Sequence, residues 1–383
     1  MKETKPYFIT ETLETLIALL QGKAYFVGGV VRDFLMHRPI KDIDMATSFN
    51  PDEVQRRLEN TDIRLIPTGI KHGTLTLLFK DGQKVEITSF RQDIQTDGRH
   101  ALVRFGTDIT QDANRRDLTI NALYMDKDGH LLDPVGGLKD LKHKRIKFIG
   151  NAEQRIKEDA LRILRFYRFY ALFAYSKPDK FAVMACRKQK KLIKNISKER
   201  IKDELFKLLS QQNPYKALRL MNQTGILSQI FEKPIHLQSI RQLFRQERQT
   251  GVIASPLFRC WVLNGCHDLP LKLSNNEKKQ INLWEKADKE NLRTTHDFLK
   301  ILFLYGKETF LNMILYKKKN LNFQCFFYMQ NLKAPVCPFS EKDVMEYFNL
   351  QGKDISTRYQ KAVKWWIDSD FPKKSVVFKA FSE

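Results

Sequence analysis

The sequence predicts an α+β amino-terminal region followed by an all-α remainder, and three observations support this fold class. Short runs of strand-forming residues, among them 24–27, 74–79 and 85–89, lie within the first 150 residues. Glycine pairs and Asp-Gly turns separate these runs. After Gly150 glycine becomes sparse, and apolar residues recur at helical spacing, as in 160–173.

The composition favours a polyanionic partner. The 383 residues include 66 lysines and arginines against 44 aspartates and glutamates, which gives a formal net charge of +22 at neutral pH. A globular chain this basic favours nucleic acid first and an anionic membrane surface second. The alternative is a basic surface that is only solvated.

The cysteine pattern and the distribution of apolar residues indicate where in the cell the protein would be found. The five cysteines are odd in number, scattered and without a Cys-x-x-Cys pair, which argues against a disulfide framework or a zinc ribbon. No apolar run approaches the roughly 18 residues that span a bilayer, and the first residues lack a secretory signal pattern. We therefore expect a soluble protein of the cytoplasm with no membrane partner.

A glycine turn between a strand and a helix is the first chemical signal. Gly28 and Gly29 follow an apolar strand and precede an amphipathic segment. Glycine allows the backbone to approach a phosphate, and a helix N-terminus offers free N–H groups. Arg32 follows within the first turns, where a forked guanidinium suits the same anion. The pattern is not Gly-x-Gly-x-x-Gly, so it predicts no dinucleotide site.

Two carboxylates shortly after the glycine turn are the second chemical signal. Asp42 and Asp44 are spaced so that a strand would project both from one face. Two adjacent carboxylates repel each other unless a cation such as Mg²⁺ binds them. Glu86, in another predicted strand, supplies a third carboxylate, and such a set suits two metal ions about 3.5–4 Å apart. An incidental surface pair is the alternative.

Basic side chains dominate two later segments. Arg115 and Arg116 precede a predicted β-type run and suit bidentate contact with triphosphate oxygens, or else pair with Asp117. Asn121 either contacts the nucleotide or satisfies buried backbone groups.

The segment 153–173 is predicted as one helix. Glu158, Asp159, Arg162 and Arg165 recur at spacings of three and four, so they would share a face. Salt bridges on a solvated face are one explanation. The other is that Asp159 and Arg162 read the Watson–Crick edge of cytosine or adenine, which both pair an amino donor with a ring acceptor.

These patterns resemble the polymerase-β-like nucleotidyltransferases, specifically the bacterial CCA-adding and poly(A) polymerase branch called class II. The similarity spans residues 24–169, under half of the chain, and the motifs occur in the family order. They are the glycine turn with Asp42 and Asp44, then 69–74, Glu86, 115–123, 133–137 and 157–169.

The resemblance implies roles for the quoted residues. Asp42 and Asp44 would hold Mg²⁺ and, with Glu86, be catalytic. The expected nucleotide-binding residues are Gly28, Gly29, Arg32, Arg115, Arg116, Asn121, Glu158, Asp159, Arg162, Arg165 and Arg168.

A family loop lies between the third carboxylate and the double arginine, and it is similar to residues 90–100 here. The resemblance implies that it helps the site to switch from CTP to ATP. Asp93, Asp97 and Arg99 match it, but its tyrosine is missing and the spacing is one residue shorter. A surface hairpin without this role is the alternative.

The resemblance implies a polymerase-β-like head with a small mixed sheet, followed by an all-α neck, body and tail. The expected regions are a catalytic head at 1–150, a neck with the base-selecting helix at 151–215, a body at 216–295 and a tRNA-binding tail at 296–383. Basic clusters at 187–191, 198–202 and 317–319 lie in the helical part among aromatic residues, which favours RNA contact.

The expected activity is that of a CCA tRNA nucleotidyltransferase, which adds CTP- and ATP-derived nucleotides to the tRNA 3′ end with Mg²⁺. Pyrophosphate would be released, and no nucleic-acid template would be used. A CC-adding-only enzyme and a poly(A) polymerase are alternatives, and a noncatalytic RNA-binding protein is the alternative from a different class. No obligatory protein partner is expected.

Overall fold

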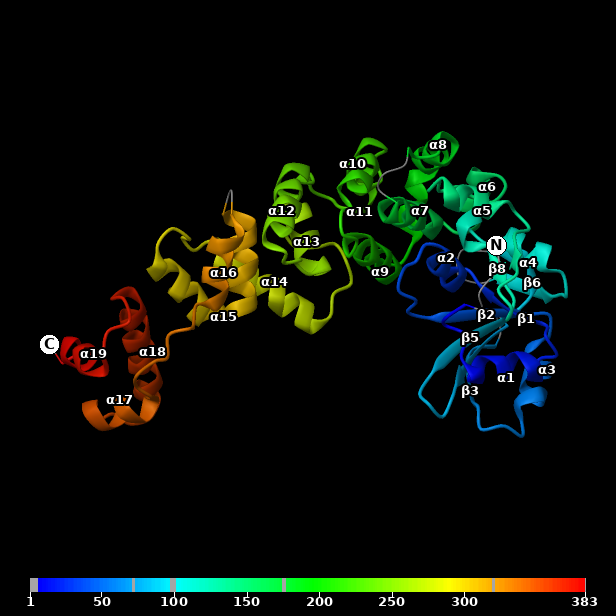
Figure 1. Cartoon of the computed structure of the whole chain (residues 1–383). Helices are drawn as coiled ribbons and strands as arrows, with labels where there is room; N and C mark the ends of the chain where they lie inside the picture. The colour runs from blue at the N-terminus through cyan, green and yellow to red at the C-terminus, as the bar shows by residue number, and fades with distance from the viewer. Residues whose placement is uncertain (1–5, 71–72, 97–100, 174–176, 319–320, 383) are drawn as a thin grey trace. The chain divides into compact units, whose positions relative to one another are not determined.

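The computed structural model describes residues 6–70, 73–96, 101–173, 177–318 and 321–382 of the chain. By its internal contacts the chain divides into two compact units, Met1–Glu232 and Lys233–Glu383. The first unit contains all the strands that the structure describes, drawn in blue to cyan in Figure 1. The predicted order of a mixed head followed by helices alone is confirmed.

Seven strands of the first unit form one mixed sheet in the order β3-β4-β5-β2-β1-β8-β9. They are β1 (Ala24–Val27), β2 (Ile43–Thr47), β3 (Arg64–Gly69), β4 (Thr74–Leu78), β5 (Lys84–Ser89), β8 (Tyr124–Met125) and β9 (Leu131–Leu132). Only β2 and β5 pair in parallel; the other neighbours are antiparallel. A separate hairpin pairs β6 (Arg91–Thr96) with β7 (Ala101–Phe105).

Apolar side chains on the central strands form the core of the head. Val27, Ala46 and Tyr124 are buried in one cluster with Phe90, which packs edge to face against Tyr124. In β5 buried and more exposed residues alternate, so one face of this strand packs against the core. The core therefore fixes the strand ends that bear the predicted carboxylates.

Helices complete the first unit. In the head they are α1 (Glu11–Leu19), α2 (Gly29–Leu35), α3 (Pro51–Leu58), α4 (Ile109–Arg115), the 3-10 turn η2 (Thr119–Asn121) and α5 (Gly137–Lys142). Then follow α6 (Ala152–Glu158), α7 (Leu161–Leu172), α8 (Lys180–Gln189), η3 (Lys190–Asn195), α9 (Lys198–Leu209), α10 (Tyr215–Gln223) and α11 (Leu227–Ile230). The β-type run expected directly after Arg116 is instead η2.

The prediction of a single helix over 153–173 is wrong. Asp159 has an extended backbone (φ −151°, ψ 107°) between α6 and α7. Its carboxylate accepts a hydrogen bond at 3.0 Å from the backbone N–H of Leu161, one of the N–H groups that lack a helical partner at the start of α7. Arg162 donates at 2.9 Å to the carbonyl of Arg155, which also accepts a longer bond of 3.4 Å from the backbone N–H of Asp159. Side chains thus supplement the backbone hydrogen bonds at the break.

The second unit is helical throughout its described part. Its helices are α12 (Leu237–Thr250), α13 (Pro256–Leu263), α14 (Asn275–Asp288), α15 (Thr295–Lys317), α16 (Phe323–Asn331), α17 (Glu341–Phe348), α18 (Lys353–Asp368) and α19 (Lys374–Ala380). Trp366 and Phe378 are buried in a cluster near its end. Among the residues described, no helix has the length and apolarity required to cross a membrane.

Candidate active site

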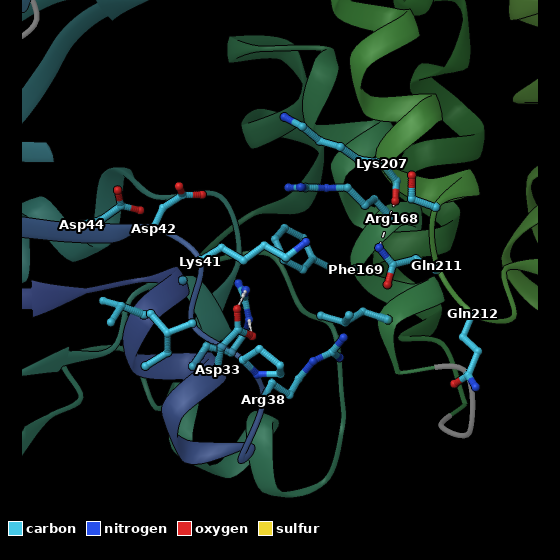
Figure 2. Close-up of a pocket in the computed structure, with 17 residues that line it drawn as sticks. Asp33, Arg38, Lys41, Asp42, Asp44, Arg168, Phe169, Lys207, Gln211 and Gln212 are labelled. Carbon is cyan, nitrogen blue, oxygen red and sulfur yellow. Dashed lines mark hydrogen bonds and ion pairs between the residues drawn. The ribbon is translucent and has the colours of Figure 1, made fainter. Parts of the chain in front are cut away.

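Two aspartates lie together at the start of β2. Asp44 is opposite Glu86, because β2 and β5 pair in parallel register. Asp42 lies just before β2, not within it as predicted, and Figure 2 shows the two carboxylates side by side. Among the described residues, neither aspartate has an ion-pair partner.

The charge around Asp44 is what a cation site requires. Burial raises the pKa of Asp44, the charges of Glu86 and Asp42 also raise it, and the opposing effects of Arg116 and Arg32 do not cancel the increase. A divalent cation bound by hard carboxylate oxygens would relieve this repulsion. The residues present therefore fit Mg²⁺.

The glycine turn brings the chain close to a second segment. Gly28 has a φ of +72°, and a Cβ there would lie 3.4 Å from the carbonyl oxygen of Asn121. Glycine is favoured on both counts. Arg32, only 8% exposed, donates to Oδ1 of Asn121 at 2.6 Å and pairs with Asp33 at 2.9 Å.

Asn121 connects this turn to a buried ion pair. Its amide donates to Oδ1 of Asp117 at 3.2 Å, and Asp117 pairs with Nε of Arg165 at 2.5 Å. Both partners of the Asn121 side chain are side chains, so satisfying backbone groups is not its role. Burial alone would raise the pKa of Asp117, but Arg165 and the hydrogen bonds outweigh it and hold that pKa well below its usual range.

The double arginine has a partner that the sequence did not indicate. Arg115 and Arg116 both pair with Asp112, at 2.7 and 3.0 Å, and not with Asp117 as the alternative held. The pairing is local, since Asp112 lies one turn earlier on α4. The hydroxyl of Tyr124 donates to the same carboxylate at 2.6 Å. These bonds orient the two guanidinium groups.

The candidate base-selecting pair lies at the break between α6 and α7. Arg162 Nη1 pairs with Glu158 at 2.6 Å. Asp159 accepts from Arg200 of α9 at 2.8 Å. Arg155, which sequence analysis missed, pairs with Glu158 at 2.6 Å and donates to the carbonyl oxygen of Arg116 at 2.6 Å. Arg155 therefore joins this break to the double arginine of the head.

A cavity of about 440 Å³ collects the predicted residues. Its lining comprises Gly28, Gly29, Arg32, Asp44, Arg115, Arg116, Asp117, Asn121, Asp159, Arg162, Arg165, Arg168 and Phe169. Every predicted nucleotide-binding residue except Glu158 is in this set. The volume is in the range of small-molecule sites.

A groove of about 670 Å³ adjoins this cavity, and Asp44 lines both. Asp42 also lines the groove, while Arg168 and Lys207 lie across from the two carboxylates (Figure 2). Arg38 and Lys41 add further positive charge. Sequence analysis missed these last two residues and Lys207, because nothing in their spacing distinguishes them from other surface cations.

Some predicted residues are not brought into this site. Glu86 is exposed, and it lines neither the cavity nor the groove. Asp93 is in β6, but nothing is described of its side chain. Asp97 and Arg99 lie outside the described residues.

Comparison with known proteins decides the family. A model described as the poly A polymerase head domain matches residues 24–147, and one described as the probable RNA and SrmB-binding site of polymerase A matches 178–237. The CCA tRNA nucleotidyltransferase 1, mitochondrial, of Danio rerio is 31% identical over 97% of this chain and 90% of its own length. This chain belongs to the CCA tRNA nucleotidyltransferase family.

Other members of the CCA tRNA nucleotidyltransferase family support this placement. The CCA-adding enzyme of Bacillus velezensis is 41% identical over 54% of this chain and 52% of its own length. The predicted resemblance and the enzyme class, nucleotidyltransferase, are thereby confirmed.

Comparison with solved structures tests the predicted fold class. The Bacillus stearothermophilus CCA-adding enzyme in complex with CTP has a TM-score of 0.70 at 24% identity and covers 94% of both chains. The Thermotoga maritima CCA-adding enzyme complexed with tRNA has a TM-score of 0.69 at 22% identity, over 98% of this chain and 96% of its own. The predicted fold class is confirmed.

Proposed function

We propose that this protein is a CCA tRNA nucleotidyltransferase, which extends the 3′ end of tRNA with CTP- and ATP-derived nucleotides and releases pyrophosphate. The observation that carries the proposal is that Asp44 lines both the cavity and the adjoining basic groove. A nucleoside triphosphate in the cavity and an RNA end in the groove would meet at this carboxylate. The proposal requires no nucleic-acid template, because Asp159 and Arg162, which line the cavity, would read the base.

The proposed cofactor is Mg²⁺, held by Asp42 and Asp44, with Glu86 adding negative charge from the neighbouring strand. When bound, the metal would activate the attacking hydroxyl and neutralise phosphate charge. Arg32 and Arg116 would bind triphosphate oxygens, and their fork geometry suits bidentate contact. The existing bonds of Arg116 to Asp112 hold its guanidinium in place before the nucleotide arrives.

Base choice is assigned to Asp159 and Arg162. An ionised carboxylate accepts hydrogen bonds and a guanidinium donates them, which matches the amino group and ring acceptor shared by cytosine and adenine. The keto oxygens of guanine and uracil would face the carboxylate unfavourably. The names of the structural relatives support CTP and, in another complex, ATP as the substrates.

The acceptor end of tRNA is the proposed RNA partner. Arg38, Lys41 and Lys207 line the groove beside the carboxylates and would neutralise its phosphates. The four proposed regions are the head at 1–150, the neck at 151–215, the body at 216–295 and the tail at 296–383. The end of the last head helix at Lys142 supports the first boundary. A cytoplasmic location stays a prediction, because the relatives include mitochondrial and bacterial proteins.

One observation favours a second candidate. The loop with Asp93, Asp97 and Arg99 is one residue shorter than the family pattern and lacks its tyrosine. Since this loop is linked to the switch from CTP to ATP, its shortening favours a CC-adding-only enzyme.

The decisive assay gives the purified protein a tRNA that ends before its CCA sequence, with CTP alone, ATP alone, or both. The proposal requires extension by two cytidines with CTP alone and by one further adenosine when ATP is added. Termination after CC with ATP in excess would identify a CC-adding enzyme. Long tails made from ATP alone would identify a poly(A) polymerase, and no incorporation at all would leave a noncatalytic RNA-binding protein.

A further inference from the structure

Helix α9 presents charged side chains to the nucleotide-binding residues around α7. Arg200, Glu204 and Lys207 recur at helical spacing and so share one face of α9. Arg200 binds Asp159 at 2.8 Å, and Glu204 lies 2.9 Å from Nε of Arg168. None of the motifs that indicated the site contains these three residues.

Two donors, one close in the chain and one distant, hold the two oxygens of the Asp159 carboxylate. The Leu161 backbone N–H, two residues away, donates to Oδ1 at 3.0 Å. Nη2 of Arg200, 41 residues away, donates to Oδ2 at 2.8 Å. A carboxylate has about four acceptor sites, so both oxygens keep room for a further donor. Arg200 therefore orients Asp159 without consuming its capacity to accept from a nucleobase.

We infer that Arg200 is a positioning residue for nucleobase choice. It fixes the plane of the Asp159 carboxylate so that an oxygen meets the exocyclic amino group of cytosine or adenine. This inference rests on the proposed function of Asp159. Without Arg200, the Leu161 N–H would hold one oxygen, but the carboxyl torsion, which has a broad minimum, would be free to turn. Hydrogen bonds weaken steeply with misalignment, so discrimination would fall before chemistry does.

Glu204, on the same face of α9, provides an internal contrast. It is 4% exposed and lies near Arg165 and Arg168, at 3.8 and 2.9 Å, away from the base-selecting pair. Burial lowers the pKa of Arg168 to about 10, and the negative charge of Glu204 opposes this decrease. Loss of Glu204 would thus weaken the binding of every nucleotide by Arg165 and Arg168 to the same extent.

The test measures kcat and KM for CTP and for UTP on a tRNA that lacks its CCA end. The full-length proteins are the wild type, Arg200→Ala, Arg200→Lys, Glu204→Gln and a control, Asp203→Asn, which changes an exposed acid of α9. We expect Arg200→Ala to lower the CTP-to-UTP ratio of kcat/KM about tenfold, with Arg200→Lys in between. Glu204→Gln should raise both KM values in the same proportion, and Asp203→Asn should behave as wild type.

A ratio for Arg200→Ala within about twofold of wild type would overturn the inference, even if both activities fell together. Should this variant fail to fold, Arg200→Met, which keeps an unbranched side chain but has no donor, gives the same comparison with the same threshold. Equilibrium binding of CTP and UTP to the same proteins reads base choice without transfer. If the wild type transfers no nucleotide, the proposed function is refuted. If it still binds CTP more tightly than UTP, and Arg200→Ala loses this preference, the inference about Arg200 is sustained.

Discussion

The charged side chains of this site differ in whether another side chain of the protein already pairs with them. Arg116 is bound to Asp112, and Arg165 to Asp117, so their positions are set before substrate binds. Asp42 and Asp44 have no such partner among the described residues. The arginines are therefore already held by protein side chains, whereas the two aspartates carry negative charge that a cation could neutralise.

Replacement of Asp44 by asparagine should abolish nucleotide incorporation while leaving tRNA binding nearly intact. The change removes a hard oxygen anion from the proposed metal site and leaves in place the cations that line the groove, Arg38, Lys41 and Lys207. Loss of several kcal/mol of transition-state stabilisation corresponds to about a thousandfold lower kcat. Incorporation and filter binding measure the two effects, and near-normal turnover with Mg²⁺ present would refute the metal assignment. Asp42→Asn is expected to behave in the same way.

The Asp44→Asn variant should be more stable than wild type in metal-free buffer at neutral pH. The pKa of Asp44 is raised in the folded protein, so the folded state binds this proton more tightly than the unfolded state does. Its contribution to stability is present below the unfolded pKa of 3.8 and is lost as the pH rises through the folded pKa. Thermal melts of both proteins at acid and neutral pH test this. Mg²⁺ should raise the melting temperature of wild type only.

Arg162→Ala should relax base choice more than it slows chemistry. Arg162 is held by Glu158 and by the carbonyl of Arg155, so its donors have a defined direction toward the cavity that it lines. Loss of a directed donor pair is worth about 1–3 kcal/mol, or roughly fivefold to 150-fold in selectivity. Competition between CTP and UTP measures it, with Arg56→Ala, an exposed arginine of α3, as control. Unchanged selectivity would mean that Arg162 has no part in reading the base.

Breaks and connections between elements place these side chains. The break at Asp159 turns what would be one helix into α6 and α7, and Arg155 ties it to the backbone of the double arginine. The predicted switching loop, residues 90–100, includes strand β6, which pairs with β7. Helix α8 and the turn η3 carry the basic cluster at 187–191.

The switching loop should affect the last addition alone. Asp97→Ala or Arg99→Ala is expected to leave both cytidine additions intact and to stall before the terminal adenosine, because a polar turn linked to the hairpin would no longer adjust the base-selecting residues. Product lengths on denaturing gels give the answer. Full CCA addition by both variants would show a hairpin without this role.

Neutralising Lys188, Lys190 and Lys191 together should weaken tRNA binding and flatten its salt dependence. Each lost phosphate contact lowers the slope of log affinity against log salt by about 0.7–0.9. Lys188 already pairs with Glu153 at 2.8 Å, so its share should be the smallest. Binding titrations at several salt concentrations measure the slope, and the KM for CTP serves as control. An unchanged slope would mean that the cluster is only a solvated surface.

At the scale of the whole molecule, the chain consists of two units with separate cores. The candidate site lies entirely within Met1–Glu232, while the second unit buries its own aromatic side chains, such as Trp261 and Trp284. We therefore expect the chemistry in the first unit, while the proposed contacts of the tail with tRNA belong to the second.

This division predicts that residues 1–232 fold alone and bind CTP about as tightly as the full chain does. Their affinity for tRNA should fall by about tenfold or more, since fewer phosphates are neutralised. Thermal denaturation, calorimetry with CTP and filter binding with tRNA check the three statements. An insoluble fragment, or one that binds tRNA as the full chain does, would contradict the division.

The sequence by itself determined the class of the head, the order of its motifs and almost the whole lining of the cavity. This was possible because the motifs resemble those of a known family, and because glycine turns, paired carboxylates and arginine spacings reflect local geometry. Strands 24–27 and 85–89 were predicted for the same reason, from apolar runs between turns.

Only the tertiary structure decided which polar and charged side chains bind each other. Arg32 and Asn121 are 89 residues apart, and Arg200 and Asp159 are 41 apart. No local pattern specifies such partners, because they depend on how elements pack against one another. The break at Asp159 also escaped prediction, since its spacing alone favours a continuous helix and only the surrounding side chains make the interruption stable.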